Sequence, residues 1–388
     1  MEQKSYFLPI LIISQFACTS LWFAGNAIVD DLALKTGLGA EIIGYVLSSV
    51  QLGFITGTLV FALLMIADRF SPSKVFVICA MLAALCNFSL LADVITKWHL
   101  LFARFATGFF LAGIYPVGMK IAADYYENGL GKALGFLVGA LVLGTAFPFL
   151  ISGMKLLSDY TLIIIITSVL AIVGGLLIFF LVPNGPYRKQ SAKLQLKAGL
   201  QLFKIIPFRK AAFGYFGHMW ELYAFWAFTP LAIKTINKIQ NTSFSIPLWT
   251  FIIIALGSLS CIVGGYFSEK IGSYKVALFS LAFSGSLCLL SPFLFQLPSF
   301  MFLIGWCIWG MVVTADSPQF SSLVANVAPS TLKGTGLTLV NCLGFAISVI
   351  SIQLVSFLIL YINTTLIFIF LGIGPITGCY HLIKKNSQ

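Results

Sequence analysis

Residues 160–182 read YTLIIIITSVLAIVGGLLIFFLV, a run without a single charged side chain. A helix needs about 20 predominantly apolar residues to cross the hydrocarbon core of a bilayer. An open sheet cannot cross lipid, and this run lacks the alternation of polar and apolar residues that is typical of a barrel strand. The segment therefore predicts a transmembrane helix.

The rest of the chain repeats this pattern. Of the 388 residues, 59% are hydrophobic and 9% are charged, whereas a soluble domain carries about 25% charged residues. The N-terminal apolar run, residues 6–29, follows the basic Lys4 and so resembles a signal peptide. It is longer than a signal peptide, and we expect it to be retained as the first membrane helix. The sequence predicts an all-α membrane protein with twelve spans, at 6–29, 42–67, 74–95, 99–123, 130–154, 160–182, 211–234, 247–268, 275–295, 299–325, 333–360 and 362–382.

The basic residues set the orientation. The formal net charge is +11, but the basic side chains lie at the ends of apolar runs, which argues against binding to nucleic acid. With the N-terminus inside, sixteen of the 23 Lys and Arg residues fall on the cytoplasmic side, five fall outside, and Arg104 and Lys120 lie within a span. This positive-inside bias predicts cytoplasmic termini in the cytoplasmic (inner) membrane.

The longest polar stretch of the chain is residues 183–210, PNGPYRKQSAKLQLKAGLQLFKIIPFRK, which follows directly on the span 160–182. The stretch is basic and lacks acidic residues, and its middle could form a helix on the anionic inner leaflet. We interpret it as a cytoplasmic linker between an N-terminal six-helix half (1–182) and a C-terminal six-helix half (211–388).

The two halves repeat with an offset of 201 residues. The end of the second span, LLMIADRFSPSK (63–74), matches the end of the eighth, VGGYFSEKIGSYK (263–275). The same offset aligns Tyr115 with Asp316 in spans four and ten. A duplicated six-helix unit is typical of secondary transporters. The matched pairs also include Asp68 with Glu269, Arg69 with Lys270, Ser71 with Gly272, Lys74 with Lys275, Lys132 with Lys333 and Gly135 with Gly336.

The repeated loop, acidic–basic–x–Gly/Ser–x–x–Lys, resembles the signature loop of the major facilitator superfamily. RFATGFFLAGIYPVGMK (104–120) is similar to that family's Arg-x-x-x-Gly pattern in span four, and GHMWELYAFWAF (217–228) with DSPQFSSLVA (316–325) resembles a prokaryotic branch. The first loop departs from the family at Leu64 and at 71–73, and span five lacks the Gly-Pro pair of many antiporters. The resemblance implies that spans one, four, seven and ten line a central cavity.

Glu221 is the acid nearest the middle of a span, where an ionisable group costs about 2.5–3.5 kcal/mol to insert. Burial favours the neutral form of a carboxyl, so a proton can bind there. His218 lies on the same helix face, with Trp220 and Tyr223 as aromatic neighbours. The sequence predicts a proton-coupling or substrate-contacting site, with a structural His218–Glu221 hydrogen bond, or one to span eleven, as the alternative.

Three further groups are candidates for the same site. Asp316 precedes Ser317-Pro318, where a proline can open the helix; the alternative is an acid that caps the broken turn. Arg104, with Tyr115 on roughly its face, offers a fork for a carboxylate, or else pairs with a structural acid or extends toward the interface. Lys120 lies nearer the cytoplasm, where extension toward the interface competes with contact to substrate.

Span one carries a polar stripe at helical spacing, which lines the cavity or packs against other helices. Its members in the candidate site are Gln15, Trp22 and Asn26.

The loop charges suggest a cytoplasmic gate formed by Asp68, Arg69, Lys74, Glu269, Lys270, Lys132 and Lys333. We expect Asp68 to meet the start of span eleven and Glu269 the start of span five, because helix N-termini attract anions. The alternative is a pair of solvated loops that contribute little energy.

These features predict an alternating-access transporter for a small polar organic solute with or without a carboxylate, coupled to protons. Efflux of amphipathic compounds and a non-transporting sensor are the alternatives. The three histidines lie in different spans, no HExxH or GxSxG motif occurs, and the eight cysteines lack metal-ligand spacing. We therefore expect a monomer in the lipid bilayer without enzyme activity, cofactor or metal.

Overall fold

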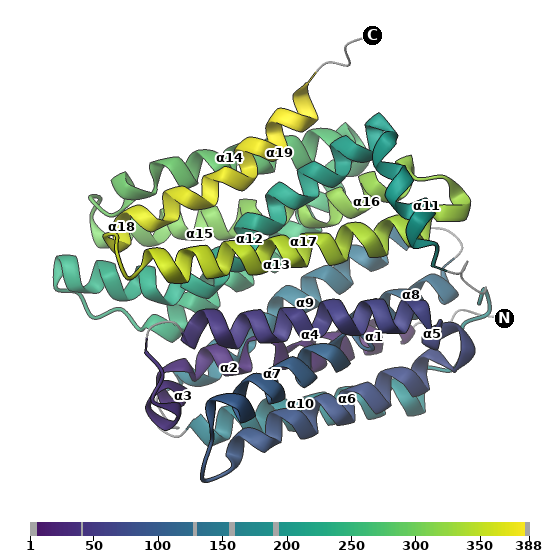
Figure 1. Ribbon diagram of the computed structural model, residues 1–388, viewed down its shortest axis with the longest axis horizontal. Coiled ribbons are helices and arrows are strands. Elements are labelled where there is room, and N and C mark those ends of the chain that lie inside the picture. Colours follow the sequence, from purple (N-terminus) through teal and green to yellow (C-terminus); the bar gives the residue numbers. More distant parts are fainter. Residues whose placement is uncertain (1–5, 40–41, 127–129, 155–159, 189–193, 385–388) are drawn as a thin grey trace. The chain divides into compact units, whose positions relative to one another are not determined.

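The computed structural model describes residues 6–39, 42–126, 130–154, 160–188 and 194–384. The chain divides into two compact units, Met1–Ser191 and Ala192–Gln388, and the boundary lies inside the predicted linker. The regular elements in the described part are helices (Figure 1). The predicted all-α class is confirmed.

The first unit is a bundle of long helices joined by short ones. Its elements are α1 (Phe7–Thr19), α2 (Leu21–Ala27), α3 (Val29–Thr36), α4 (Ile42–Leu63), α5 (Ile66–Arg69), α6 (Pro72–Phe88), η1 (Ser89–Leu91), α7 (Lys97–Leu111), α8 (Tyr115–Tyr125), α9 (Leu130–Gly153) and α10 (Tyr160–Leu181).

The second unit is built in the same manner. Its elements are α11 (Leu196–Gln201), η2 (Leu202–Lys204), α12 (Ile206–Gln240), α13 (Ile246–Ile271), α14 (Ser273–Leu294), α15 (Ser299–Ala315), α16 (Ser317–Val327), η3 (Ser330–Leu332), α17 (Lys333–Leu358), α18 (Thr364–Ile367), η4 (Phe368–Gly372) and α19 (Ile373–Ile383).

Within the described residues, eleven helices or joined helix pairs are long and apolar enough to cross a membrane, and they coincide with eleven of the predicted spans. The remaining predicted span corresponds to α12, which has 35 residues, or about 50 Å at 1.5 Å per residue. Its polar side chains, including His218 and Glu221, keep it out of the apolar set. The chain is thus a multi-pass membrane protein, and α12 is its most polar long helix.

The structure differs from the sequence prediction at the start of α12 and in the continuity of spans one and four. We expected the linker to extend to residue 210, but α12 begins at Ile206, with Pro207 in its first turn. Proline fits the first turn because its missing N–H would have no helical partner there. Spans one and four were each predicted as one helix. Span one is interrupted at Ser20, and span four is interrupted between Leu111 and Tyr115.

The interruptions of spans four and ten are equivalent under the repeat. In the second unit α15 ends at Ala315 and α16 begins at Ser317, leaving Asp316 at the break. The offset of 201 residues places Asp316 on Tyr115, the first residue of α8. Both second segments carry a proline in the first turn, where the ring ends the preceding hydrogen-bond pattern.

The two copies of the charged loop have different backbones. In the first unit α4 ends at Leu63, Met65 adopts a left-handed φ of 53°, and Asp68 lies on the four-residue helix α5. In the second unit α13 continues through Glu269, and the residue with a positive φ is Gly272, at 86°. Glycine occupies that region at no steric cost, whereas methionine does not.

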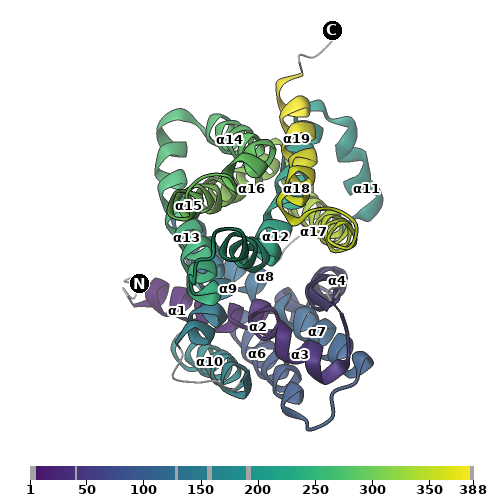
Figure 2. The same cartoon turned by 90° about the vertical axis from the view of Figure 1, so that its left-hand side faces the viewer.

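Small residues allow the closest helix contacts inside each unit. In the first unit, a Cβ added to Gly53 or Gly108 would overlap a main-chain carbonyl oxygen on the facing helix, of Phe105 or Val50 respectively. In the second unit, Gly217 of α12 and Gly374 of α19 approach each other in the same way. Figure 2 views many helices end-on and shows α12 close to α17 and α19. Lipid provides no hydrophobic force between helices, so this close backbone packing stabilises each bundle.

We predict that Gly108→Ala lowers the stability of the purified protein by about 1–3 kcal/mol, because the new methyl group forces α4 and α7 apart. Thermal unfolding in detergent measures the change. The matched control is Gly135→Ala on α9, where an added Cβ meets nothing within 4 Å. A Gly108→Ala variant as stable as that control would contradict the packing argument.

Candidate functional site

Glu221 lies on α12 with its side chain fully buried in the second unit. Trp309 Nε1 donates a 2.6 Å hydrogen bond to Glu221 Oε1, and the Cys288 thiol lies 3.3 Å from the same oxygen. The hydroxyl of Ser284 lies 2.7 Å from Oε2. In the described part of the chain no basic side chain lies within ion-pair distance of Glu221. The carboxyl is therefore bound by neutral groups from α14 and α15.

An aromatic cluster lies beside this carboxyl. The ring of Trp309 contacts Phe225 at 4.8 Å, Trp306 at 5.0 Å and Phe368 at 6.3 Å between centroids. These four rings are fully buried. Packing of the other three rings against Trp309 fixes the indole that donates to Glu221.

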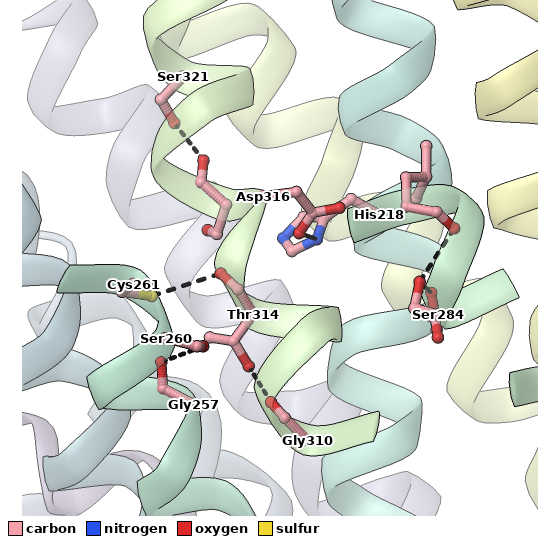
Figure 3. Close-up of polar contacts among 12 residues, drawn as sticks. His218, Gly257, Ser260, Cys261, Ser284, Gly310, Thr314, Asp316 and Ser321 are labelled. Atoms are coloured by element: carbon pink, nitrogen blue, oxygen red, sulfur yellow. Dashed lines mark hydrogen bonds and ion pairs between the residues drawn. The ribbon is translucent and has the colours of Figure 1, made fainter. Parts of the chain in front are cut away.

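His218 and Asp316 form a second buried pair in the same unit. His218 Nδ1 lies 2.8 Å from Asp316 Oδ1, and both side chains are buried. Figure 3 shows the carboxyl of Asp316, which lies at the break between α15 and α16, beside the imidazole ring of His218 from α12. The expected alternative of a His218–Glu221 hydrogen bond does not occur, because each residue has a partner on a different helix.

The helix around the break is held by local hydrogen bonds. The Thr314 hydroxyl donates to the carbonyl of Gly310 at 2.7 Å, and the Cys261 thiol of α13 donates to the carbonyl of Thr314 at 3.3 Å (Figure 3). Cys261 thus binds a carbonyl in the last turn of α15, where a helix leaves acceptors unsatisfied. The geometry fixes Asp316 relative to α12 and α13.

Trp220 and Tyr223, the expected aromatic neighbours of Glu221, point to other helices. The half-buried Trp220 donates through Nε1 to the carbonyl of Phe370 at 3.0 Å. Tyr223 is buried against Phe345 of α17 at 5.2 Å and Trp226 at 5.3 Å. Both therefore anchor α12 in its bundle.

Arg104 is fully buried in the first unit. Its Nη2 donates to the carbonyls of Trp22 at 2.6 Å and Leu21 at 3.2 Å, and Nη1 lies 3.5 Å from Asn87 Oδ1. Gly25 leaves room for the guanidinium, because a Cβ there would lie 3.0 Å from Arg104 Nε. In the described residues the cation has only neutral acceptors, so the structural acid considered as its partner is not found there.

Asn87 extends this network to α10. Its Nδ2 donates to Ser168 Oγ at 2.9 Å and to Thr167 Oγ1 at 3.2 Å. The network therefore joins α2, α6, α7 and α10 through buried polar groups.

The predicted polar stripe on span one is buried within the first unit. Trp22 packs on Phe54 at 4.8 Å between centroids. The carboxamides of Gln15 and Asn26 have no hydrogen-bond partner among the described residues, and each such group costs about 1–3 kcal/mol. Tyr115 is half-buried at the start of α8.

The expected gate residues differ between the two units. Lys120 Nζ of α8 lies 2.8 Å from Asp68 Oδ1 and 3.9 Å from Asp124 Oδ1, so Lys120 binds an acid rather than extending outward. Arg188 Nη2 donates to the carbonyls of Asp68 and Phe70 at 3.0 and 2.9 Å. The side chain of Lys132 lies outside the described residues. The remaining predicted gate residues are exposed: Arg69, Lys74, Glu269, Lys270 and Lys333.

Among the described residues, no group of three or more His, Cys, Asp or Glu side chains could hold a metal ion.

A family model described as the Major Facilitator Superfamily matches residues 10–352. The chain belongs to the major facilitator superfamily. No curated protein matches the chain.

Solved structures of the superfamily share its fold. The human organic anion transporter MFSD10 (TETRAN) is 14% identical, with a TM-score of 0.76 over 98% of this chain and 100% of that one. A point mutant of the nucleoside transporter NupG is 16% identical, with a TM-score of 0.72 over 97% of this chain and 99% of that one. The transporter fold is thus shown.

The partners of Glu221 and Arg104 were not predicted from the sequence. Ser284 and Cys288 lie four residues apart on one face of α14, a spacing that could have indicated a polar contact. The sequence around Trp309 did not indicate a contact with Glu221, because tryptophan also occurs as a packing residue in apolar spans. Asn87 was the more informative residue, because an intramembrane carboxamide needs a partner.

We predict that Arg104→Lys destabilises the purified protein by about 2 kcal/mol, because an ammonium group cannot reach the two carbonyls and Asn87 together. The measurement is the thermal unfolding temperature in detergent. Arg69→Lys, at an exposed position, provides the control and should leave that temperature unchanged. If Arg104→Lys behaves like this control, the guanidinium does not hold α2 in place.

Proposed function

We propose that the protein is a proton-coupled secondary transporter that moves a small polar organic solute by alternating access, with Glu221 as the proton-binding group. The observation that carries the proposal is the set of neutral partners around a fully buried carboxyl. A coupling group must exist in both protonation states, and the two states must favour different conformations.

Ser284 fits both protonation states of Glu221. Its hydroxyl lies 2.7 Å from Glu221 Oε2 and 3.1 Å from the carbonyl oxygen of Leu281. A hydroxyl has one proton and can accept as well as donate. It donates to the carboxylate when Glu221 is charged, and it accepts from the carboxylic acid while donating to Leu281 when Glu221 is neutral. Rotation of one hydroxyl therefore satisfies either state.

The His218–Asp316 pair is the second candidate for coupling. It joins α12 to the break between α15 and α16, at 2.8 Å and in a buried setting. Protonation of either partner changes the charge of this contact. We propose that the pair responds to the state of Glu221 three residues away on α12, because low-dielectric surroundings strengthen such interactions.

Polar side chains in the first unit support a polar solute. Buried carboxamides, hydroxyls and one guanidinium lie among the apolar side chains of its helices. MFSD10 is described as an organic anion transporter and NupG as a nucleoside transporter, and both solute types are polar. For this chain we propose a polar organic solute.

We propose that the transporter is a monomer in the cytoplasmic membrane. The distribution of its basic residues supports an orientation with both termini inside. In this orientation the Asp68 and Glu269 loops lie at the cytoplasmic side. We propose that they act as a gate. The ion pair of Asp68 with Lys120 supports this role in the first unit, because it ties the loop to α8 of span four.

We predict that Glu221→Gln abolishes accumulation driven by a pH gradient but preserves solute exchange. A glutamine amide can donate to Ser284 and accept from Trp309, so it imitates the protonated carboxyl and cannot release a proton. The measurement compares uptake under an imposed pH gradient with counterflow at equal pH in proteoliposomes, over a panel of polar solutes.

A matched serine pair on α14 is the control. Ser284→Ala removes a partner of Glu221 and should change the pH dependence of uptake. Ser286→Ala should not, because the exposed Ser286 hydroxyl bonds the carbonyl of Ala282 on its own helix. Full gradient-driven accumulation by Glu221→Gln with unaltered pH dependence would reject Glu221 as the coupling group.

We also predict that Asp68→Asn slows transport about fivefold while expression is spared, since loss of a partly buried ion pair costs roughly 1 kcal/mol. The initial rate of uptake in proteoliposomes is the readout. Asp93→Asn, at an exposed position, is the control. Equal rates for Asp68→Asn and the wild type would argue against the gate.

A further inference from the structure

Two carboxamides on the first membrane span are buried without hydrogen-bond partners. Gln15 on α1 is 0% exposed and Asn26 on α2 is 6% exposed. Neither the nitrogen nor the oxygen of either carboxamide has a partner among the described residues. A membrane interior offers no water in compensation, so such groups are expected to acquire partners in some state of the working protein.

Neighbouring polar side chains on the same span behave differently. The Cys18 thiol bonds the carbonyl of Ala171, the Thr19 hydroxyl bonds that of Gln15 at 2.8 Å, and the Ser20 hydroxyl bonds that of Ala17 at 2.7 Å. The Ser14 hydroxyl also lacks a partner among the described residues, but it lies about 100° from Gln15 around the helix. The carboxamides are therefore distinguished by having both a donor and an acceptor unused.

Gly118 of α8 makes room for Gln15. A Cβ at this position would overlap Gln15 Oε1, so the absence of a side chain brings the amide directly against the α8 backbone. Gly118 lies one turn after Tyr115, on a similar face of the helix. The amide of Gln15 is thus fixed between two spans at about mid-length of the first span.

Gln15 and Asn26 lie on one face of the span, because eleven steps of about 100° leave a difference of about 20°. Their Cα atoms are separated by about 16 Å along an ideal axis, with the junction of α1 and α2 between them. A small solute cannot contact both at once. The two carboxamides therefore mark two successive positions along one helix face.

We propose that Gln15 and Asn26 are successive hydrogen-bonding positions for the transported solute, and that this solute carries an amide-type edge with an N–H donor beside a C=O acceptor. The proposal rests on the proposed transport function and adds the chemical class of the solute. Gln15 holds the solute at mid-membrane, and Asn26 meets it nearer the end of α2.

The chemistry of the unused atoms selects this class. A group that offers a donor beside an acceptor can pair with both atoms of a carboxamide at once, as an adenine edge does. A carboxylate would use only the N–H donors and leave the carbonyl oxygen unpaired. Arg104, the buried cation of this unit, already has the carbonyls of Leu21 and Trp22 as acceptors.

The test uses purified full-length protein and isosteric probe pairs: nicotinamide with nicotinate, glutamine with glutamate, and asparagine with aspartate, together with uracil. Ligand-induced shifts of the thermal unfolding temperature give the affinities. We expect at least one amide-bearing probe to stabilise the wild type while its carboxylate partner does not. Gln15→Leu should weaken that binding at least about tenfold.

Stability without ligand separates a binding role from a structural one. Because the Gln15 carboxamide makes no hydrogen bond among the described residues, Gln15→Leu should leave the unfolding temperature of the ligand-free protein unchanged or raise it. Gly118→Ala, which displaces the Gln15 amide, should also weaken binding of the amide probe. Thr19→Val is the matched control, because its hydroxyl already bonds its own helix. It should bind as the wild type does.

Four outcomes would overturn the inference: selective binding of the carboxylate probes, wild-type affinity in Gln15→Leu, a lower unfolding temperature of ligand-free Gln15→Leu, or no response to any amide probe. Gradient-driven uptake of the wider solute panel is measured on the same preparation. If another solute accumulates, the transport function stands although the amide class fails. If no solute responds to the gradient, the proposed transport function itself fails.

Discussion

Hydrocarbon supplies no hydrogen-bond partner, and this constraint accounts for the position of nearly every polar side chain described above. Most hydroxyls bond a carbonyl of their own helix, as Thr19, Thr167 and Thr314 do. Arg104 uses carbonyls of α2, and Glu221 uses donors from two other helices. Polar groups without such a solution are therefore informative, because their cost has to be offset by function.

The duplicated units share a framework but differ in chemistry. Spans four and ten are interrupted at equivalent places, yet the offset of 201 residues puts Glu221 opposite Ser20. At Ser20 the first span breaks into α1 and α2, whereas α12 runs unbroken through Glu221. The acids of the bilayer centre, Glu221 and Asp316, both lie in the second unit, and the buried cation Arg104 lies in the first. Duplication preserved the helices while their buried side chains diverged.

Local pattern predicted the spans and the break at Asp316, because apolar length and a proline act on the segment that contains them. The sequence also identified the polar residues of α12, because a charged residue stands out within an apolar run. It did not identify the residues that contact them. Helical spacing suggested a contact between His218 and Glu221, but tertiary packing gave each a partner on a different helix. Ser284 and Trp309 resemble ordinary residues of an apolar span until the bundle is assembled.

The left-handed residue Met65 gives the two charged loops different mechanical linkage. Because α13 is continuous through Glu269, the carboxylate of Glu269 moves together with that helix whenever the helix tilts. Asp68 instead follows the helix break at Met65. Its side chain forms an ion pair with Lys120, and its carbonyl accepts a hydrogen bond from Arg188. Its displacement therefore follows span four and the linker, not the span that precedes it. The position of Glu269 is therefore coupled to its own helix, whereas the position of Asp68 is coupled to neighbouring segments.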